Sequence, residues 1–110
     1  MPAEFLDIAM TPDVMAVQHE MGSDELWQSP HRQRRGERFG ASEEAMIATR
    51  DSFYLATLSQ TGWPYIQHRG GPAGFLHLLD DTTLAMADFS GNRQYITTGN
   101  LRGSDRACLF

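Results

Sequence analysis

The chain has 110 residues, which is material for about one domain. Nine arginines, no lysine and fourteen acidic residues give a formal net charge of -5, which argues against a chain-wide cationic surface for nucleic acid or anionic lipid. Hydrophobic residues make up 41% of the chain, enough for a folded core and too many for a disordered protein. The lack of lysine also excludes Schiff-base chemistry on a lysine amine.

The cysteine content and the first residues indicate the cellular compartment of the protein. The single cysteine, Cys108, can form no disulfide within the chain, and no cysteine pair has the spacing of a zinc site. The opening stretch MPAEFLDIAM is acidic where a secretory signal is basic, and no apolar run reaches membrane-spanning length. We therefore expect a cytoplasmic protein that binds neither membrane nor nucleic acid.

Residues 1–40 are predicted to form a helical and irregular extension ahead of a folded part, 41–110. Thr11-Pro12-Asp13 has the N-cap, the first-turn proline and the first-turn acid of a helix that Gly22 would end. Ser23-Asp24-Glu25 can cap a second short helix through Trp27. Residues 31–40 hold four arginines and almost no apolar residue. A basic patch for nucleic acid is one interpretation, but a solvated linker fits better, because interleaved aromatic residues are lacking.

The second part begins with a helix and continues with strands. Residues 41–50 have Ser42 as a possible cap and two acidic residues in the first turn. A period of two then predicts strands over 53–59, 65–69, 75–79 and 83–88. Gly62 permits the first hairpin turn, a glycine-rich loop covers 70–74, and Asp80-Asp81 forms the next turn. We expect these four strands to form one antiparallel meander.

Residues 90–110 add a helix and a final strand. Residues 90–99 are predicted to be helical, with Ser90 as N-cap and Gly99 just past the end. Residues 106–110 begin another apolar strand, and the sequence stops inside it. We therefore expect either a fragment of a longer protein or a sheet edge that another segment or a second chain covers.

Two segments are candidates for ligand binding. Alternation places Gln67 and Arg69 on one face of the second strand, and a guanidinium beside an amide suits a phosphate or a flat heteroaromatic ring. An arginine at a sheet edge before a glycine turn explains the same residues equally well. The segment Ser90-Gly91-Asn92-Arg93-Gln94 enters the predicted helix, where free backbone amides can bind an anion. Ordinary capping with an exposed Arg93 is the alternative. Together, Arg69 and Arg93 could converge on one phosphate.

Other reactive side chains have no pattern typical of a site. The four histidines lack metal-ligand spacing, so we expect no metal. Ser59 and Ser90 lack a nucleophile-elbow pattern, and Cys108, in an apolar strand, is predicted to be a buried, inert thiol. No side chain is assigned as a catalytic acid, base or nucleophile.

Residues 53–110 resemble the pyridoxamine 5'-phosphate oxidase-like family of FMN-binding split barrels. The markers are Gly62-Trp63-Pro64, Gln67-His68-Arg69 and Gly91-Asn92-Arg93-Gln94. The resemblance implies a mainly β fold with short helices, an antiparallel split β-barrel that is incomplete at its C-terminus and follows a helical N-terminal section. It further implies a homodimer that binds FMN in clefts between its subunits.

The resemblance also implies which residues contact FMN. They lie on the second strand, at the end of the fourth and at the following phosphate clamp: Gln67, His68, Arg69, Asp88, Phe89, Asn92, Arg93 and Gln94. In the family's Ser-Arg-Lys clamp only the arginine is unchanged, so phosphate binding would depend more on Arg93 and Arg69. The family's substrate-contacting residues lie beyond residue 110, and the long N-terminal section is typical of an oxidase-related subgroup.

The expected function is therefore that of an FMN-dependent oxidoreductase acting on a small molecule that the sequence does not identify. The alternative is a dimeric split-barrel module without turnover, either a flavin carrier or a protein without cofactor.

Overall fold

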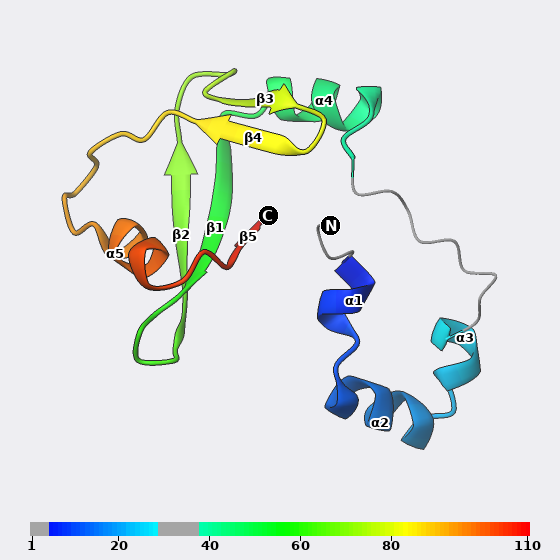
Figure 1. The fold of residues 1–110 in the computed structure, drawn as a ribbon. Coiled ribbons are helices and arrows are strands. Elements are labelled where there is room, and N and C mark those ends of the chain that lie inside the picture. Colours follow the sequence, from blue (N-terminus) through cyan, green and yellow to red (C-terminus); the bar gives the residue numbers. More distant parts are fainter. Residues whose placement is uncertain (1–4, 29–37) are drawn as a thin grey trace. The chain divides into compact units, whose positions relative to one another are not determined.

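The computed structural model describes residues 5–28 and 38–110, and the chain divides into two units, Met1–Arg38 and Phe39–Phe110 (Figure 1). Short helices occur in both units, whereas every strand of the described residues lies in the second unit, where all pairing is antiparallel. Among the described residues, no helix combines the length and the apolar character needed to cross a bilayer. Most of the arginine-rich segment 31–40 lies outside the described residues.

The described part of the first unit has three short helices: α1 (Phe5–Ala9), α2 (Pro12–Glu20) and α3 (Asp24–Gln28). The predicted cap of α2 is confirmed, because Thr11 Oγ1 accepts a hydrogen bond from the Val14 amide at 3.3 Å. Gly22 follows the helix with a φ of 73°, in the left-handed region that favours glycine. A hydrogen bond from His19 to Asp24, 2.8 Å long, holds the pKa of that carboxyl below its usual range.

The described part of the first unit has no buried core of its own. No residue of α1 or α2 is buried, and most of the large apolar side chains here are exposed, among them Phe5, Ile8, Val17, Met21 and Leu26. The fully buried residues of the described chain all belong to the second unit. The packed core of the described chain therefore lies in the second unit.

The helix that opens the second unit, α4 (Ala41–Ala48), was predicted, but its cap was not. Gly40 occupies the N-cap position with an extended backbone and offers no side-chain cap. The prediction that Ser42 caps the helix is wrong, because Ser42 already lies in the first turn, where its hydroxyl donates to Glu43 Oε2 at 2.9 Å. Acidic Glu43 and Glu44 still lie at the positive end of the helix dipole.

Five strands form two separate sheets. The strands are β1 (Ser52–Leu58), β2 (Pro64–Gly70), β3 (Leu76–Asp80), β4 (Thr83–Met86) and β5 (Ala107–Leu109). One sheet has the order β2-β1-β5, and the other is the β3-β4 hairpin. All five strands were predicted near these positions, and the turns at Gly62 and at Asp80-Asp81 are confirmed.

The predicted four-strand meander is wrong, because β3 does not pair with β2. After β2 the chain bends sharply: the Gly71 amide bonds to the Asp51 carbonyl at 3.0 Å and the Phe75 amide to the Pro72 carbonyl at 2.9 Å. Pro72 has no amide hydrogen to offer a ladder. As a result β3 leaves the plane of the first sheet, and the described residues form two antiparallel sheets and no closed barrel.

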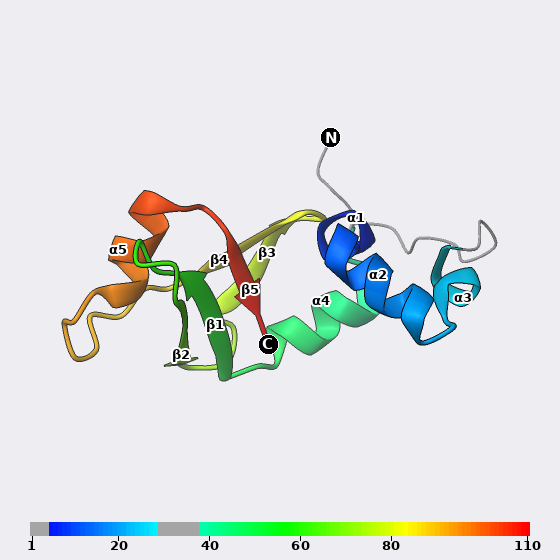
Figure 2. The same ribbon diagram turned by 90° about the horizontal axis from the view of Figure 1, so that it is seen from below.

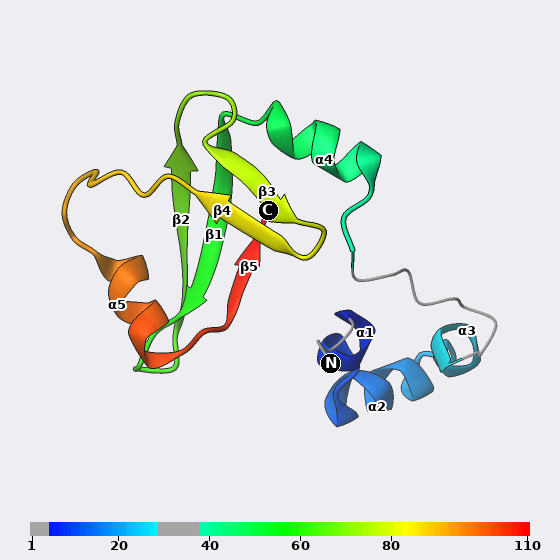
Figure 3. The same ribbon diagram turned by 45° about the horizontal axis from the view of Figure 1, so that its top comes forward.

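The core lies between β1 and the start of β3. Phe53 and Leu55 on β1 are buried together with Phe75 and Leu76, and the rings of Phe53 and Phe75 stack with centroids 5.7 Å apart. The β3-β4 hairpin therefore covers one face of β1, which we call the inner face (Figure 3). Thr57 also points to this face and is buried.

The opposite, outer face of the β2-β1-β5 sheet is exposed. It carries Tyr54, Leu58 and Ile66, whose exposed fractions are 46%, 42% and 60%. Cys108 pairs with Ala56 on this face and is also exposed. The prediction of a buried Cys108 is therefore wrong: in the described chain no element covers the outer face of β5, whose three residues are all exposed.

The last helix, α5 (Ile96–Gly103), begins six residues later than predicted for 90–99. The segment before it forms turns instead, because Asn92 Oδ1 accepts from the Gln94 amide at 3.0 Å and the Arg93 amide bonds to the Ser90 carbonyl at 3.1 Å. Such local bonds compete with helical ones. Ser90 therefore caps no helix, and Gly99 lies inside α5.

Helices α4 and α5 lie at opposite ends of β1 (Figures 1 and 2). Helix α5 is tied to the first sheet by two hydrogen bonds. Thr97 Oγ1 donates to Gln67 Oε1 at 2.8 Å, and Asn100 Nδ2 donates to Thr57 Oγ1 at 3.0 Å. These bonds place the first turn of α5 beside β2, where the candidate site lies.

Candidate functional site

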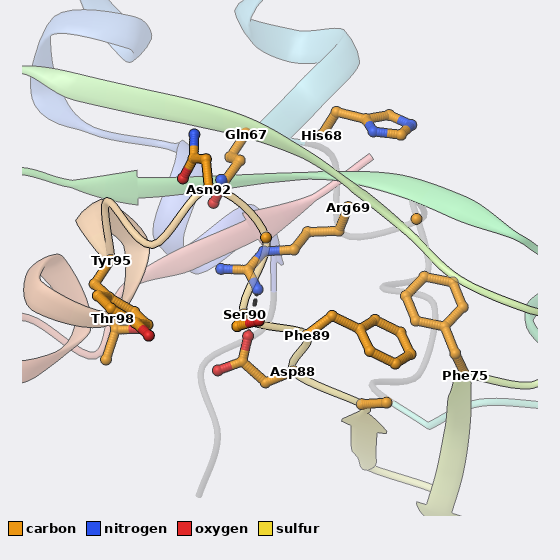
Figure 4. Close-up of a pocket in the computed structure, with 13 residues that line it drawn as sticks. Gln67, His68, Arg69, Phe75, Asp88, Phe89, Ser90, Asn92, Tyr95 and Thr98 are labelled. Carbon is orange, nitrogen blue, oxygen red and sulfur yellow. Dashed lines mark hydrogen bonds and ion pairs between the residues drawn. The ribbon is translucent and has the colours of Figure 1, made fainter.

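A pocket of about 130 Å³ lies where three segments of the second unit meet: the end of β2, the loop that follows β4, and the start of α5 (Figure 4). Burial along β2 alternates so that Tyr65, Gln67 and Arg69 are half-buried while Ile66 and His68 are exposed. The prediction that Gln67 and Arg69 share a face is therefore confirmed. Both side chains come from the inner face of the strand and line the pocket.

The structure brings six of the eight predicted contact residues together around this pocket: Gln67, His68, Arg69, Asp88, Phe89 and Asn92. Arg93 and Gln94 do not line it. His68 lines the rim, but its ring lies against the ring of Tyr54 at a centroid distance of 5.4 Å, on the outer face of the sheet. Only part of the predicted set therefore presents side chains to one cavity.

Arg69 and Asp88 form an ion pair within the pocket lining. Arg69 Nη1 donates to Asp88 Oδ1 at 2.6 Å, shown as a dashed line in Figure 4. The two side chains differ in exposure: 15% for Arg69 and 61% for Asp88. Arg69 Nε is buried and has no acceptor among the described residues. Unsatisfied buried donors are uncommon in folded proteins and mark arrangements that a ligand or a rearrangement can complete.

Two phenyl rings form one wall of the pocket. The rings of Phe75 and Phe89 lie 6.5 Å apart with an interplanar angle of 31°, and Phe75 also stacks on the core residue Phe53. Gly71 leaves room for them, because a Cβ at this position would lie 2.8 Å from carbon atoms of both rings. The wall is apolar, and it is held in place by the core on its inner side.

Two side-chain amides contribute hydrogen-bond donors. The oxygen of Gln67 already accepts from Thr97, and that of Asn92 accepts from the Gln94 amide. The amide nitrogen of neither residue bonds to another described residue. With the guanidinium of Arg69, the pocket therefore offers donors and an apolar wall, a combination that suits a flat ligand bearing an anionic group.

The predicted clamp of two arginines is not formed. Arg93 lies in the turn before α5 with a φ of 62°, is exposed and does not line the pocket. The reason is the late start of α5, which leaves residues 90–94 as a loop rather than a first helical turn. Of the two arginines proposed to meet, only Arg69 faces the cavity.

Sequence reasoning missed four side chains of the pocket: Phe75, Ala87, Tyr95 and Thr98. Tyr95 and Thr98 lie on the side of the Arg69–Asp88 pair opposite to Phe89 (Figure 4). Tyr95 is the N-cap residue of α5, with a left-handed φ of 55°, and Thr98 lies in the first turn of the helix. A correct helix start would have placed both residues at the beginning of α5. Phe75 gave no such signal, because a core phenylalanine and a pocket phenylalanine look alike in sequence.

No group of three or more His, Cys, Asp or Glu residues in the described part of the chain could hold a metal ion. No protein-family model, no curated protein and no solved structure matches this chain. The resemblance of residues 53–110 to FMN-binding split barrels therefore stays a prediction.

Proposed function

We propose that this chain is an FMN-binding flavoprotein, related to pyridoxamine 5'-phosphate oxidase, that acts as an oxidoreductase on a small molecule. The observation that carries the proposal is the placement of Arg69, a largely buried guanidinium beside a wall formed by two phenyl rings. The guanidinium suits a phosphate, and the phenyl wall suits a flat ring system. FMN carries both groups.

The residues present fit part of this cofactor. Arg69, Gln67 and Asn92 offer donors for the phosphate or for the carbonyl edges of the ring, and Phe75 and Phe89 offer an apolar surface. The volume of about 130 Å³ is smaller than the roughly 300–1,000 Å³ of most small-molecule sites. One chain would therefore enclose only a portion of FMN, and a second subunit would cover the rest.

When bound, FMN would supply the electron-transfer chemistry itself. The side chains of this chain would bind and orient it. Arg69 would neutralise the phosphate charge, the amides of Gln67 and Asn92 would fix its orientation, and the two phenyl rings would exclude water from one side. No residue of the pocket is proposed as a general acid, a general base or a nucleophile.

The proposal includes a homodimer in the cytoplasm. Its support is the small volume of the pocket, which leaves part of an FMN for a second copy to cover. Light scattering on the purified full chain measures the mass directly. A monomer at all concentrations would contradict the dimer and would leave the pocket to be tested by FMN binding alone.

The test of FMN binding is a titration of the purified full chain into FMN, followed by flavin fluorescence. We expect the natural chain to quench the fluorescence of FMN. Arg69→Ala should bind FMN at least about tenfold more weakly, since a buried charge-assisted contact is lost. Arg93→Ala is the matched control, because it removes the same side chain outside the pocket and should change the affinity by less than about twofold. Unquenched FMN with the natural chain, or equal losses for both variants, would contradict the assignment.

A second candidate function is a split-barrel module without turnover, either a flavin carrier or a protein without cofactor. The pairing of Arg69 with Asp88 favours this second function, because the guanidinium is already bonded to an acidic side chain. Purified protein that is yellow, but whose flavin is not reduced by NADH or NADPH, would indicate a carrier. Colourless protein that takes up no FMN would indicate a module without cofactor.

A further inference from the structure

We propose that Asp88 is a built-in competitor for the anionic group of the ligand, so that binding at Arg69 requires the Asp88 carboxylate to move out. This inference rests on the proposed function and concerns the selectivity of the same pocket. Its basis is the ion pair between Arg69 Nη1 and Asp88 Oδ1, 2.6 Å long, within the lining of the cavity.

The two partners are held very differently. Arg69 lies on β2, directly opposite Phe53 of β1 in the antiparallel register, and its side chain is only 15% exposed. Asp88 follows the end of β4, outside any regular element, and its side chain is 61% exposed. The carboxylate can therefore turn into solvent without disturbing the core, whereas the guanidinium cannot leave its place between strand and pocket.

An incoming anion at Arg69 would lie close to the Asp88 carboxylate. Asp88 already accepts one hydrogen bond from Nη1, and Nε is buried, so the donors nearest to solvent are the remaining hydrogens of Nη1 and Nη2 on the same guanidinium. An anion that stayed near Arg69 with Asp88 in place would also be repelled by the carboxylate charge. The exchange is favourable for a phosphate monoester, which carries more than one negative charge at neutral pH and has three acceptor oxygens. A ligand with a single or a diffuse negative charge gains less, so it displaces Asp88 less readily than a phosphate does.

Removing the Asp88 charge should change the binding free energy by a small amount that is still measurable as a change in FMN affinity. Partly exposed ion pairs are weak, so breaking the Arg69–Asp88 pair lowers the affinity for FMN only modestly. We expect Asp88→Asn, which keeps the side-chain shape and removes the charge, to bind FMN between about threefold and tenfold more tightly than the natural chain. Riboflavin has the same ring and lacks the phosphate, so its affinity should be unchanged.

The experiment measures dissociation constants of FMN and riboflavin by flavin fluorescence for the natural chain, Asp88→Asn and Asp105→Asn. Asp105 is 91% exposed and does not line the pocket, so its variant controls for the change in net charge. A gain for FMN that is confined to Asp88→Asn and absent with riboflavin supports the proposal. Weaker or unchanged FMN binding by Asp88→Asn, an equal gain for Asp105→Asn, or an equal gain for riboflavin would overturn it.

These outcomes separate the two proposals. If the natural chain binds FMN and Asp88→Asn binds it no better, the competitor role fails and the FMN assignment stands. If neither protein binds FMN at concentrations up to the millimolar range, the FMN assignment fails, and the competitor role fails with it.

Discussion

Asn100 and Thr57, 43 residues apart in the chain, are joined inside the second unit by a hydrogen bond of 3.0 Å from Asn100 Nδ2 to Thr57 Oγ1. The two residues are only 8% and 5% exposed. Because Thr57 lies on β1 and Asn100 on α5, this bond fixes the helix whose start carries Tyr95 and Thr98 into the pocket. The position of one pocket wall therefore depends on a contact outside the pocket.

The first prediction concerns this bond. Asn100→Ala leaves the buried Thr57 hydroxyl without its partner, so we expect the free energy of unfolding to fall by about 1–3 kcal/mol. Urea denaturation followed by circular dichroism measures the change. Thr98→Ala, at an exposed position of the same helix, should change it by less than about 0.5 kcal/mol. Equal effects of the two substitutions would show that the buried bond has no special role.

The second prediction concerns Gly71 at the end of β2. An added Cβ would lie 2.8 Å from carbon atoms of both Phe75 and Phe89, and Phe75 is a buried core residue. We expect Gly71→Ala to destabilise the protein by about 1–3 kcal/mol through overpacking. Gly99→Ala is the control with the opposite sign: Gly99 lies inside α5 with open space around its Cβ position, so alanine there should stabilise by about 0.5–1 kcal/mol. A tolerated Gly71→Ala would mean that both rings can move.

The local elements were predictable because their signals are local. Alternation located the strands, and Gly62 and the Asp80-Asp81 pair located two turns. Thr11 was recognised as a cap because threonine, proline and aspartate occur there in the usual order. The same reasoning failed at Ser42 and Ser90, where a possible cap lies next to residues that form the turn or the helix start themselves. Capping signals alone do not decide between neighbouring positions.

The tertiary arrangement was less accessible from sequence. Strand alternation says which residues share a face, and it placed Gln67 and Arg69 together. It does not say which strand edges meet, so the separation of β3 from β2 could not be foreseen. The ion pair between Arg69 and Asp88 joins residues 19 positions apart, one on β2 and the other in the loop after β4, and no spacing rule predicts it. Arg93, the second arginine of the expected clamp, does not line the pocket because α5 begins later than predicted.

The third prediction concerns the pH dependence of stability at the β3-β4 turn. The Thr82 backbone amide, then the hydroxyls of Thr83 and Thr82, hold the pKa of Asp80 below its usual value of 3.8. A lowered pKa in the folded state means that the ionised carboxylate stabilises the fold above pH 3.8 and that this contribution is lost as the pH falls through the lowered pKa. We expect Asp80→Asn to lower the urea midpoint at pH 7 and to have little effect at about pH 2.

The control for Asp80→Asn is Asp105→Asn, which removes the same charge from a side chain that is 91% exposed. It should lower the midpoint at pH 7 by less than Asp80→Asn does. A difference between Asp80→Asn and the natural chain that is as large at about pH 2 as at pH 7 would show that ionisation of Asp80 does not stabilise the turn.

The fourth prediction concerns the thiol of Cys108, the only cysteine of the chain. It is exposed on β5, so we expect one thiol per chain to react with Ellman's reagent in native buffer without denaturant. Cys108→Ser should give no reaction. A thiol that reacts only after urea is added would contradict the exposed position, and recovery of its reactivity on dilution would identify a second copy as the cover of the outer face.

One edge of β5 is engaged by β1, and the Tyr54 and Phe110 backbones extend that pairing with bonds of 2.8 and 2.9 Å. The other edge of β5 pairs with no strand of the described chain. An unprotected edge is a template on which strands of other molecules can add, the first step of aggregation. In concentrated solution this edge is where molecules would join into growing ribbons, and Ala107→Lys would keep the protein dispersed by giving the edge a charge.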